Sequence, residues 1–379
     1  MPANKNQHFV PQSYLRLFND GDERQIDVLP LSLGRIIRGV SLRDQASRPW
    51  FYDQDGTIER ELAKLEGSAA GIIRAMLARD RPPKRLSSEH QGLIMFLALQ
   101  LARTQAAADA ENERADKLAK LLIRRMNPDN PLRDNLDLVR VTLTHPVHEA
   151  MRMAFLGTPL LYDLKLKLIV NASSTPFVAS DAPAILHNHL CDGTGTPARG
   201  YASIGLQIIL PLGPWRALLC YDGDAYAVGS PTSNVVRLLN SRHADLVNDL
   251  QWEAARHVLF VPPCADEEHL ISFWDRWRHQ SREQIVAADE VIFQDEKTMR
   301  TRLGIGAAPS AVDLSLPFVR PLRPKFPAWT GEQPPEVRHP EWVAYVGDLI
   351  QRVDDETLHP ARFVELTLKV PRMPRRRRR

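Results

Sequence analysis

The chain has few cysteines and no long apolar run, which argues against a disulfide-rich protein and against a membrane-spanning one. Its three cysteines, Cys191, Cys220 and Cys264, are widely spaced and form no CxxC pair. This pattern argues against a disulfide framework and a thiolate zinc site, so each cysteine is expected to be a small buried hydrophobe. The longest apolar stretch, 93–102, is much shorter than the roughly 18 residues of a membrane span. The N-terminus lacks the apolar core of a signal peptide, and we therefore expect a cytoplasmic protein.

Several common catalytic signatures are also missing. The sequence has no GxGxxG, no GxxxxGK followed by Ser or Thr, and no GxSxG, so a dinucleotide fold and a P-loop are not expected. The formal net charge of +3 is unevenly spread: residues 301–379 hold 14 Lys/Arg and 9 Asp/Glu, whereas the first 300 residues hold 35 and 37. The body of the protein is therefore not a basic nucleic-acid-binding domain on charge grounds.

The hydrophobic periodicity predicts an α+β protein. Residues 1–160 are predicted to be mostly helical, because apolar residues recur at helical spacing over 58–80 and an apolar run follows Ser87. Residues 165–262 contain several short apolar segments between turn residues, which predicts a mostly antiparallel sheet. Residues 233–256, within this range, and residues 266–300 are predicted to be helical. We expect the helical N-terminal half to pack on the sheet.

The composition changes after Gly304. Eleven of the 29 prolines lie beyond this residue, which predicts a single domain of residues 1–304 followed by a Pro-rich extension of residues 305–379. Residues 341–353 are the exception, because their apolar side chains form the stripe of an amphipathic helix. That helix is expected to dock on the core or on a protein partner. The Arg375–Arg379 run is expected either to contact nucleic-acid phosphates or to be an unstructured end.

The most specific pattern begins close to the N-terminus. Gln7-His8-Phe9-Val10-Pro11 is followed by Tyr14-Leu15 and Phe18. Further landmarks follow in order: Phe51-Tyr52, Leu65-Glu66, Gln100 to Thr104 around Arg103, Ser180-Asp181-Ala182-Pro183, Pro211-Leu212 and Asn240. As a set they resemble the signature of a bacterial family catalogued as domain of unknown function 4238, over roughly the first 260 residues. The chain departs from that pattern at Ala182, where Asn is usual, and the resemblance implies no established reaction.

Four polar residues within these landmarks are candidates for chemistry: His8, Glu66, Arg103 and Asp181. A His can act as acid or base near neutral pH, and paired carboxylates can hold Mg²⁺ or Mn²⁺. An Arg can bind a phosphate bidentately. We therefore predict a metal-dependent hydrolase of nucleic acid or nucleotide phosphodiesters. Glu66 and Asp181 would hold the metal, His8 would be the acid or base, and Arg103 would hold the phosphate. A toxin or a phage-defence effector is the setting we expect.

Each of the four residues also has a structural explanation. His8 could cap the first helix or bond a backbone carbonyl, and Asp181 could bond the backbone in an ordinary turn. Glu66 and Arg103 could form an ion pair between two packed helices. The alternative function is then a non-catalytic module that binds a small anionic ligand or a protein partner.

A second group of ligand-type residues lies in one predicted loop. His187, His189 and Cys191 are close enough in sequence to offer nitrogen and sulfur ligands to zinc. The sequence shows nothing nearby that completes a set of four ligands, and a metal role for this loop is therefore not favoured.

Overall fold

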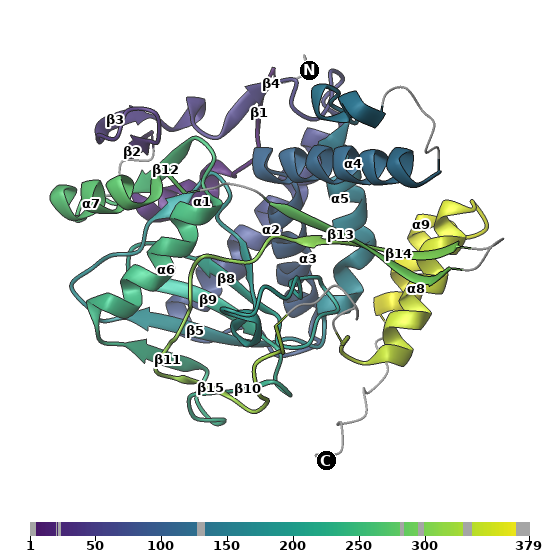
Figure 1. The fold of residues 1–379 in the computed structure, drawn as a ribbon. Helices are drawn as coiled ribbons and strands as arrows, with labels where there is room; N and C mark the ends of the chain where they lie inside the picture. The colour runs from purple at the N-terminus through teal and green to yellow at the C-terminus, as the bar shows by residue number, and fades with distance from the viewer. Residues whose placement is uncertain are drawn as a thin grey trace.

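The computed structural model describes residues 5–19, 21, 24–126, 133–280, 284–294, 299–328 and 336–368. It has a mixed α+β fold, in agreement with the expected class, with helices spread along the chain (Figure 1). The expected helical N-terminal half is not confirmed, because four strands precede the first long helix. These strands are β1 (Asn6–His8), β2 (Gln25–Pro30), β3 (Ile37–Ser41) and β4 (Ser47–Pro49). The Arg375–Arg379 run lies outside the described residues.

A five-stranded sheet lies at the centre of the molecule. Its strands are arranged in the order β11-β5-β9-β8-β7, and every neighbouring pair is antiparallel except β11 with β5. A mostly antiparallel sheet is therefore confirmed. The strands are β5 (Lys165–Asn171), β7 (Ile185–His187), β8 (Gln207–Pro211), β9 (Arg216–Tyr221) and β11 (Val235–Leu238).

The side chains of this sheet point alternately into two hydrophobic cores. On β8, Ile208 contacts the core shared with α2 (Thr57–Arg79) and α3 (Ser88–Ala102). Its neighbour Ile209 contacts the core shared with α6 (Ser241–Ala254). The sheet therefore has helices on both faces (Figure 1). Burial of both faces explains why β8 and β9 are almost continuous apolar runs rather than alternating ones.

A second sheet joins segments that are far apart in the sequence. Its order is β3-β2-β12-β6, where β12 is Val258–Val261 and β6 is Ala179–Ser180. Strand β12 pairs antiparallel with β2 and with β6. The prediction of one sheet over 165–262 is therefore wrong in part, because β6 and β12 pair with N-terminal strands instead. Local apolar patterns indicate strands but do not specify their partners.

Two predicted helices contain strands. The helix predicted over 266–300 ends early: α7 spans Glu267–Trp277, and a hairpin of β13 (Ile285–Gln294) and β14 (Met299–Ala307) follows. Valine and isoleucine in 285–291 favour the strand. In the same way, residues before Asn240 form β11, and the Asn240 side chain caps α6 by accepting from the Arg242 N–H at 2.9 Å. Two further helices, α4 (Gln105–Met126) and α5 (Pro146–Gly157), pack on each other.

The C-terminal extension packs on the rest of the chain. Strand β15 (Val319–Pro321) pairs with β10 (Tyr226–Val228). The predicted helix is α8 (Pro340–Asp354), and Trp342 on its buried face donates a hydrogen bond to the Pro159 carbonyl at 3.2 Å. Docking of this helix on the core is therefore confirmed. A second helix, α9 (Pro360–Leu368), was not expected. Among the described residues, no helix combines the length and the apolar character needed to cross a membrane.

Candidate functional site

The N-terminal motif is a packing element that fixes the position of His8. Strand β1 pairs with β4, and the chain then turns at Pro11 into the short helix α1 (Gln12–Leu15). Helix α1 is anchored by Tyr14, whose hydroxyl donates to the Pro211 carbonyl at 2.8 Å in the buried core. His8 therefore sits at the junction of a paired strand and an anchored helix, where its ring has little freedom.

A cleft of about 420 Å³ opens beside His8, between α1 and α2. The α2 side chains that line it recur at three- to four-residue intervals, so they belong to one face of the helix. The cleft is lined by His8, Gln12, Ser13, Glu59, Ala63, Glu66, Gly67, Ala70 and Arg74.

A buried arginine contacts two of the residues that line this cleft, His8 and Glu66. Arg103 follows the last residue of α3 and is 1 % exposed. Its Nη1 lies 2.6 Å from Glu66 Oε1, its Nη2 donates to the His8 carbonyl at 2.6 Å, and its Nε donates to the Tyr52 hydroxyl at 3.1 Å. The expected ion pair between Glu66 and Arg103 is therefore confirmed. Each of the three guanidinium nitrogens already has a protein partner.

Glu59 is a second carboxylate on the same face of α2, two turns before Glu66. Its Oε2 is covered and has no hydrogen-bond partner among the described residues. Burial raises the pKa of the Glu59 carboxyl to about 6, and Glu66 adds to the rise, whereas Arg103 and the backbone of His8 oppose it. At neutral pH this carboxyl is therefore close to its titration point.

The His8 ring is neutral at neutral pH. Burial lowers its pKa below the usual value, although a hydrogen bond to the Arg43 backbone and the charge of Glu66 act in the opposite direction. His8 Nε2 lies 2.8 Å from the Arg43 carbonyl oxygen and 3.1 Å from the side-chain amide of Gln12. The carbonyl can only accept and is the nearer partner, so we assign the proton to this nitrogen, with the amide oxygen of Gln12 turned toward it. The other ring nitrogen, Nδ1, is then the basic one.

The part of the chain that carries this cleft matches a family model. The model, described as "Protein of unknown function (DUF4238)", covers residues 6–262, about two thirds of the chain. The chain belongs to the DUF4238 family. No curated protein and no solved structure gives a match.

All nine residues that line the cleft lie within the DUF4238 match. The structure brings together three of the four expected site residues, since His8 and Glu66 both contact Arg103. It also adds Glu59, which the sequence reasoning missed. The available signal was its spacing of seven residues from Glu66, which places both carboxylates on one face of a helix.

The fourth expected residue, Asp181, makes a different set of contacts. Its Oδ1 accepts the Arg256 N–H at 2.8 Å and its Oδ2 accepts the His257 N–H at 2.8 Å. Burial raises the pKa of this carboxyl, whereas the two backbone hydrogen bonds lower it. Asp181 is 2 % exposed and is not among the residues that line the cleft. It fastens the chain between α6 and β12 to the end of β6.

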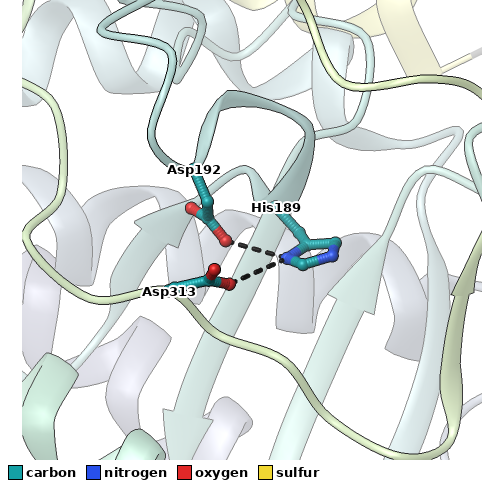
Figure 2. Close-up of side chains that lie close together, drawn as sticks. All are labelled: His189, Asp192 and Asp313. Carbon is teal, nitrogen blue, oxygen red and sulfur yellow. Dashed lines mark hydrogen bonds and ion pairs between the residues drawn. The ribbon is translucent and has the colours of Figure 1, made fainter.

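A second group of side chains that could share a metal ion lies away from the cleft. Two of its members lie within the family match and one lies in the C-terminal extension. Among the described residues, the group with three such side chains within 4.8 Å consists of His189, Asp192 and Asp313 (Figure 2). None of these residues lines the cleft.

Proposed function

We propose that this DUF4238 protein is a phosphodiesterase that acts on nucleic acid or nucleotides in the cleft between α1 and α2. The observation that carries the proposal is Glu59, which lines an open cleft beside a neutral His8. Its carboxyl has a pKa raised to about 6, and its covered Oε2 has no hydrogen-bond partner among the described residues. An acid that keeps its proton near pH 6 and a base that is neutral are the pair that acid–base catalysis needs. A toxin or phage-defence effector is a setting that such an activity would suit.

RNA is the substrate that needs least from the protein, because it carries its own nucleophile. His8 Nδ1 would take the proton of the 2′-hydroxyl, and that oxygen would attack the neighbouring phosphorus. The bond to the 5′-oxygen would break as the bond to the 2′-oxygen forms. Glu59 would give its proton to the departing 5′-oxygen. The products are a 2′,3′-cyclic phosphate and a free 5′-hydroxyl; His8 ends with the proton of the 2′-hydroxyl, and Glu59 ends ionised.

Two arginines would have different tasks in this reaction. Arg74 is exposed at the edge of the cleft and makes no ion pair with any described residue, so it is available to a phosphate. Arg103 is the arginine that the sequence assigned to the phosphate. Its three nitrogens are occupied, and we assign it the task of positioning Glu66 and the His8 backbone.

The Mg²⁺ or Mn²⁺ expected on Glu66 and Asp181 is untested, and the acid–base route does not require it. The two backbone hydrogen bonds of Asp181 account for both of its oxygens, and Glu59 is the carboxylate that shares the cleft with Glu66. Metal dependence is therefore an arm of the experiment rather than a premise of the mechanism.

A non-catalytic module is the second candidate. It is favoured by the Arg103 network, in which the ion pair and the hydrogen bonds account for Glu66, Tyr52 and the His8 carbonyl without a substrate. In this case the cleft would bind a small anionic ligand through Arg74.

The experiment is cleavage of end-labelled RNA and DNA by the purified protein, with Mg²⁺, with Mn²⁺ and with EDTA. We expect RNA cleavage that persists in EDTA and leaves cyclic phosphate ends. The variant Glu59→Gln keeps the shape of the side chain but has no proton to donate, and we expect a loss of about 10²–10⁴-fold. Glu61→Gln is the matched control, because Glu61 lies on the exposed side of the same helix in an ion pair with Lys64.

Three results would contradict parts of the proposal. Equal loss of activity in Glu59→Gln and Glu61→Gln would remove the role of Glu59. DNA cleavage that requires metal would replace the acid–base route by metal-assisted hydrolysis. No cleavage of either substrate by the folded protein would favour the binding module.

A further inference from the structure

A cluster of metal-ligand side chains lies outside the proposed active site, where the C-terminal extension crosses the loop after β7. His189 Nδ1 lies 2.8 Å from Asp192 Oδ2 and 3.6 Å from Asp313 Oδ1 (Figure 2). All three ligand atoms lie within 4.8 Å of one another. In a tetrahedral zinc site with bonds of about 2.1 Å, neighbouring ligand atoms are about 3.4 Å apart. The distances of 2.8 and 3.6 Å lie on either side of this value.

A buried histidine beside the cluster lacks the hydrogen bonds that its burial demands. His187 is 0 % exposed, and neither of its ring nitrogens makes a hydrogen bond with any described residue. Its Nε2 lies 3.2 Å from Asp192 Oδ1, on the side of the carboxylate away from His189. A buried imidazole whose two nitrogens lack well-formed hydrogen bonds is costly, and its close contact with Asp192 places it beside this cluster.

The loop that carries the two histidines is held firmly. The short 3₁₀ helix η5 (His189–Cys191) is capped by Asn188, which also donates to the carbonyls of Ala198 and Ile204 at 2.6 and 2.8 Å. The Cys191 thiol lies 3.9 Å from the Ala198 carbonyl and is not one of the clustered ligand-type side chains. The donor set is therefore nitrogen and oxygen, not sulfur.

The third ligand comes from a part of the chain beyond the family match. Asp313 lies between Val312 and Leu314, both of which are buried in the core, whereas its own side chain is 63 % exposed. This alternation presents the carboxylate to the loop. Lys325 Nζ lies 3.7 Å from Asp313 Oδ2 and donates to the Asp192 carbonyl at 3.0 Å. A cation of the protein therefore already stands beside the Asp313 carboxylate.

We propose that His189, Asp192 and Asp313 bind a divalent transition-metal ion of the zinc class, with His187 as a further ligand or as the group that orients Asp192. Imidazole and carboxylate ligands suit Zn²⁺, and a fixed second partner on a ligating group is typical of such sites. The ion would fasten the extension around Asp313 to the loop after β7. This site shares no residue with the cleft and does not depend on the proposed function.

The test uses the full-length protein and metal ions alone. Protein purified without chelator is assayed for bound metal by mass spectrometry, then stripped with EDTA and titrated with Zn²⁺, Mn²⁺ and Mg²⁺ by calorimetry and thermal unfolding. We expect about one zinc ion per chain and a higher melting temperature with Zn²⁺ than with Mg²⁺. Asp313→Asn should weaken zinc binding by at least the roughly 10–100-fold that outer-shell changes cause, and His187→Gln by about that amount.

Matched variants separate a metal site from a network of ion pairs. His269→Gln is the control, because His269 also lies 2.9 Å from an aspartate, Asp245, and no third ligand joins this pair among the described residues. Lys325→Met removes the competing cation and should tighten zinc binding. Zinc binding that is absent in the folded protein, or that Asp313→Asn leaves unchanged, would overturn the proposal. So would a Lys325→Met variant that melts lower and binds no zinc, because Lys325 would then be the cation that the cluster requires.

Discussion

Two buried arginines, Arg103 and Arg338, hold distant segments together in different ways. Arg338 lies just before α8 in the extension and pairs with Asp163 through two contacts, Nε to Oδ2 at 2.8 Å and Nη2 to Oδ1 at 3.0 Å. It also donates to the carbonyls of Ser203, Leu160 and Tyr201. Arg103 makes one contact with Glu66 and two further hydrogen bonds.

The partner carboxylate is what distinguishes the two arginines. The Asp163 side chain is 7 % exposed, whereas that of Glu66 is 21 % exposed and lines the cleft. Burial raises the pKa of Asp163, but the charge of Arg338 and a hydrogen bond to His339 hold it well below its usual range. In the cleft beside the Arg103–Glu66 pair, the pKa of the neighbouring carboxyl of Glu59 is instead raised to about 6. We call the buried Arg338–Asp163 pair closed and the cleft-lining Arg103–Glu66 pair open. The closed pair stabilises the fold, whereas the open pair lies beside groups that can exchange protons with a ligand.

The largest effect on stability is expected from Arg338→Met. It leaves Asp163 buried without its cation, and the loss of one partner of a buried pair costs about 3–5 kcal/mol. Urea unfolding followed by circular dichroism measures this change. Arg352→Met is the control, because Arg352 is exposed in the neighbouring helix α8 and its ion pair should contribute about 0–1 kcal/mol. Equal effects of the two variants would show that the Arg338 pair is not a closed one.

Arg103→Met should cost less, about 2–4 kcal/mol, because Glu66 reaches the cleft and water can solvate it. It should also change the acid of the proposed reaction. Arg103 lowers the pKa of Glu59, so without it that carboxyl keeps its proton to higher pH. The alkaline limb of the rate profile for RNA cleavage should therefore move upward. Arg338→Met should not move the alkaline limb of the rate profile. A shift of that limb in both variants would contradict the distinction between the two arginines.

Asp181→Asn should destabilise the fold by about 1–3 kcal/mol and leave cleavage intact. An asparagine offers one acceptor oxygen where the carboxylate now accepts the N–H groups of Arg256 and His257, so one buried donor loses its partner. The measurement pairs urea unfolding with the RNA assay. Activity lost in a stably folded variant would restore Asp181 to the catalytic role that its sequence motif predicted.

Local patterns predicted most elements of this fold but not their partners. Helices such as α2 and α3 follow from apolar spacing and from Ser87 as a cap, which accepts the His90 N–H at 3.2 Å. The hairpin of β13 and β14 was missed because a short apolar run fits a helix or a strand. The pairing of β12 with β2 was missed because the two strands are more than 200 residues apart.

The same limit applies to the sites. His8, Glu66 and Arg103 could be found because each lies in a recognisable motif, and Glu59 was within reach of helical spacing. The histidines near Cys191 were visible as possible ligands, but Asp313 joins them from a segment about 120 residues further on. No local pattern specifies which loop a distant segment will cross, because core packing on both sides of Asp313 decides it.

The smallest effect is a dependence of stability on pH that belongs to Glu59. Because its pKa is raised to about 6 in the folded protein from a usual 4.5, its contribution to stability is fully present below about pH 4 and is lost as the pH rises through 6. The loss would be about 2 kcal/mol for a fully buried group, and we expect about 1 kcal/mol because part of the cleft is open to water.

Glu59→Gln has no such titration. The difference in unfolding free energy between Glu59→Gln and the wild type should therefore shift by about 1 kcal/mol in favour of the variant from pH 4 to pH 7. The same difference for Glu61→Gln should not change. A difference that is flat or of opposite sign would mean that Glu59 is solvated like any surface glutamate, and the cleft would then hold no acid for the proposed reaction.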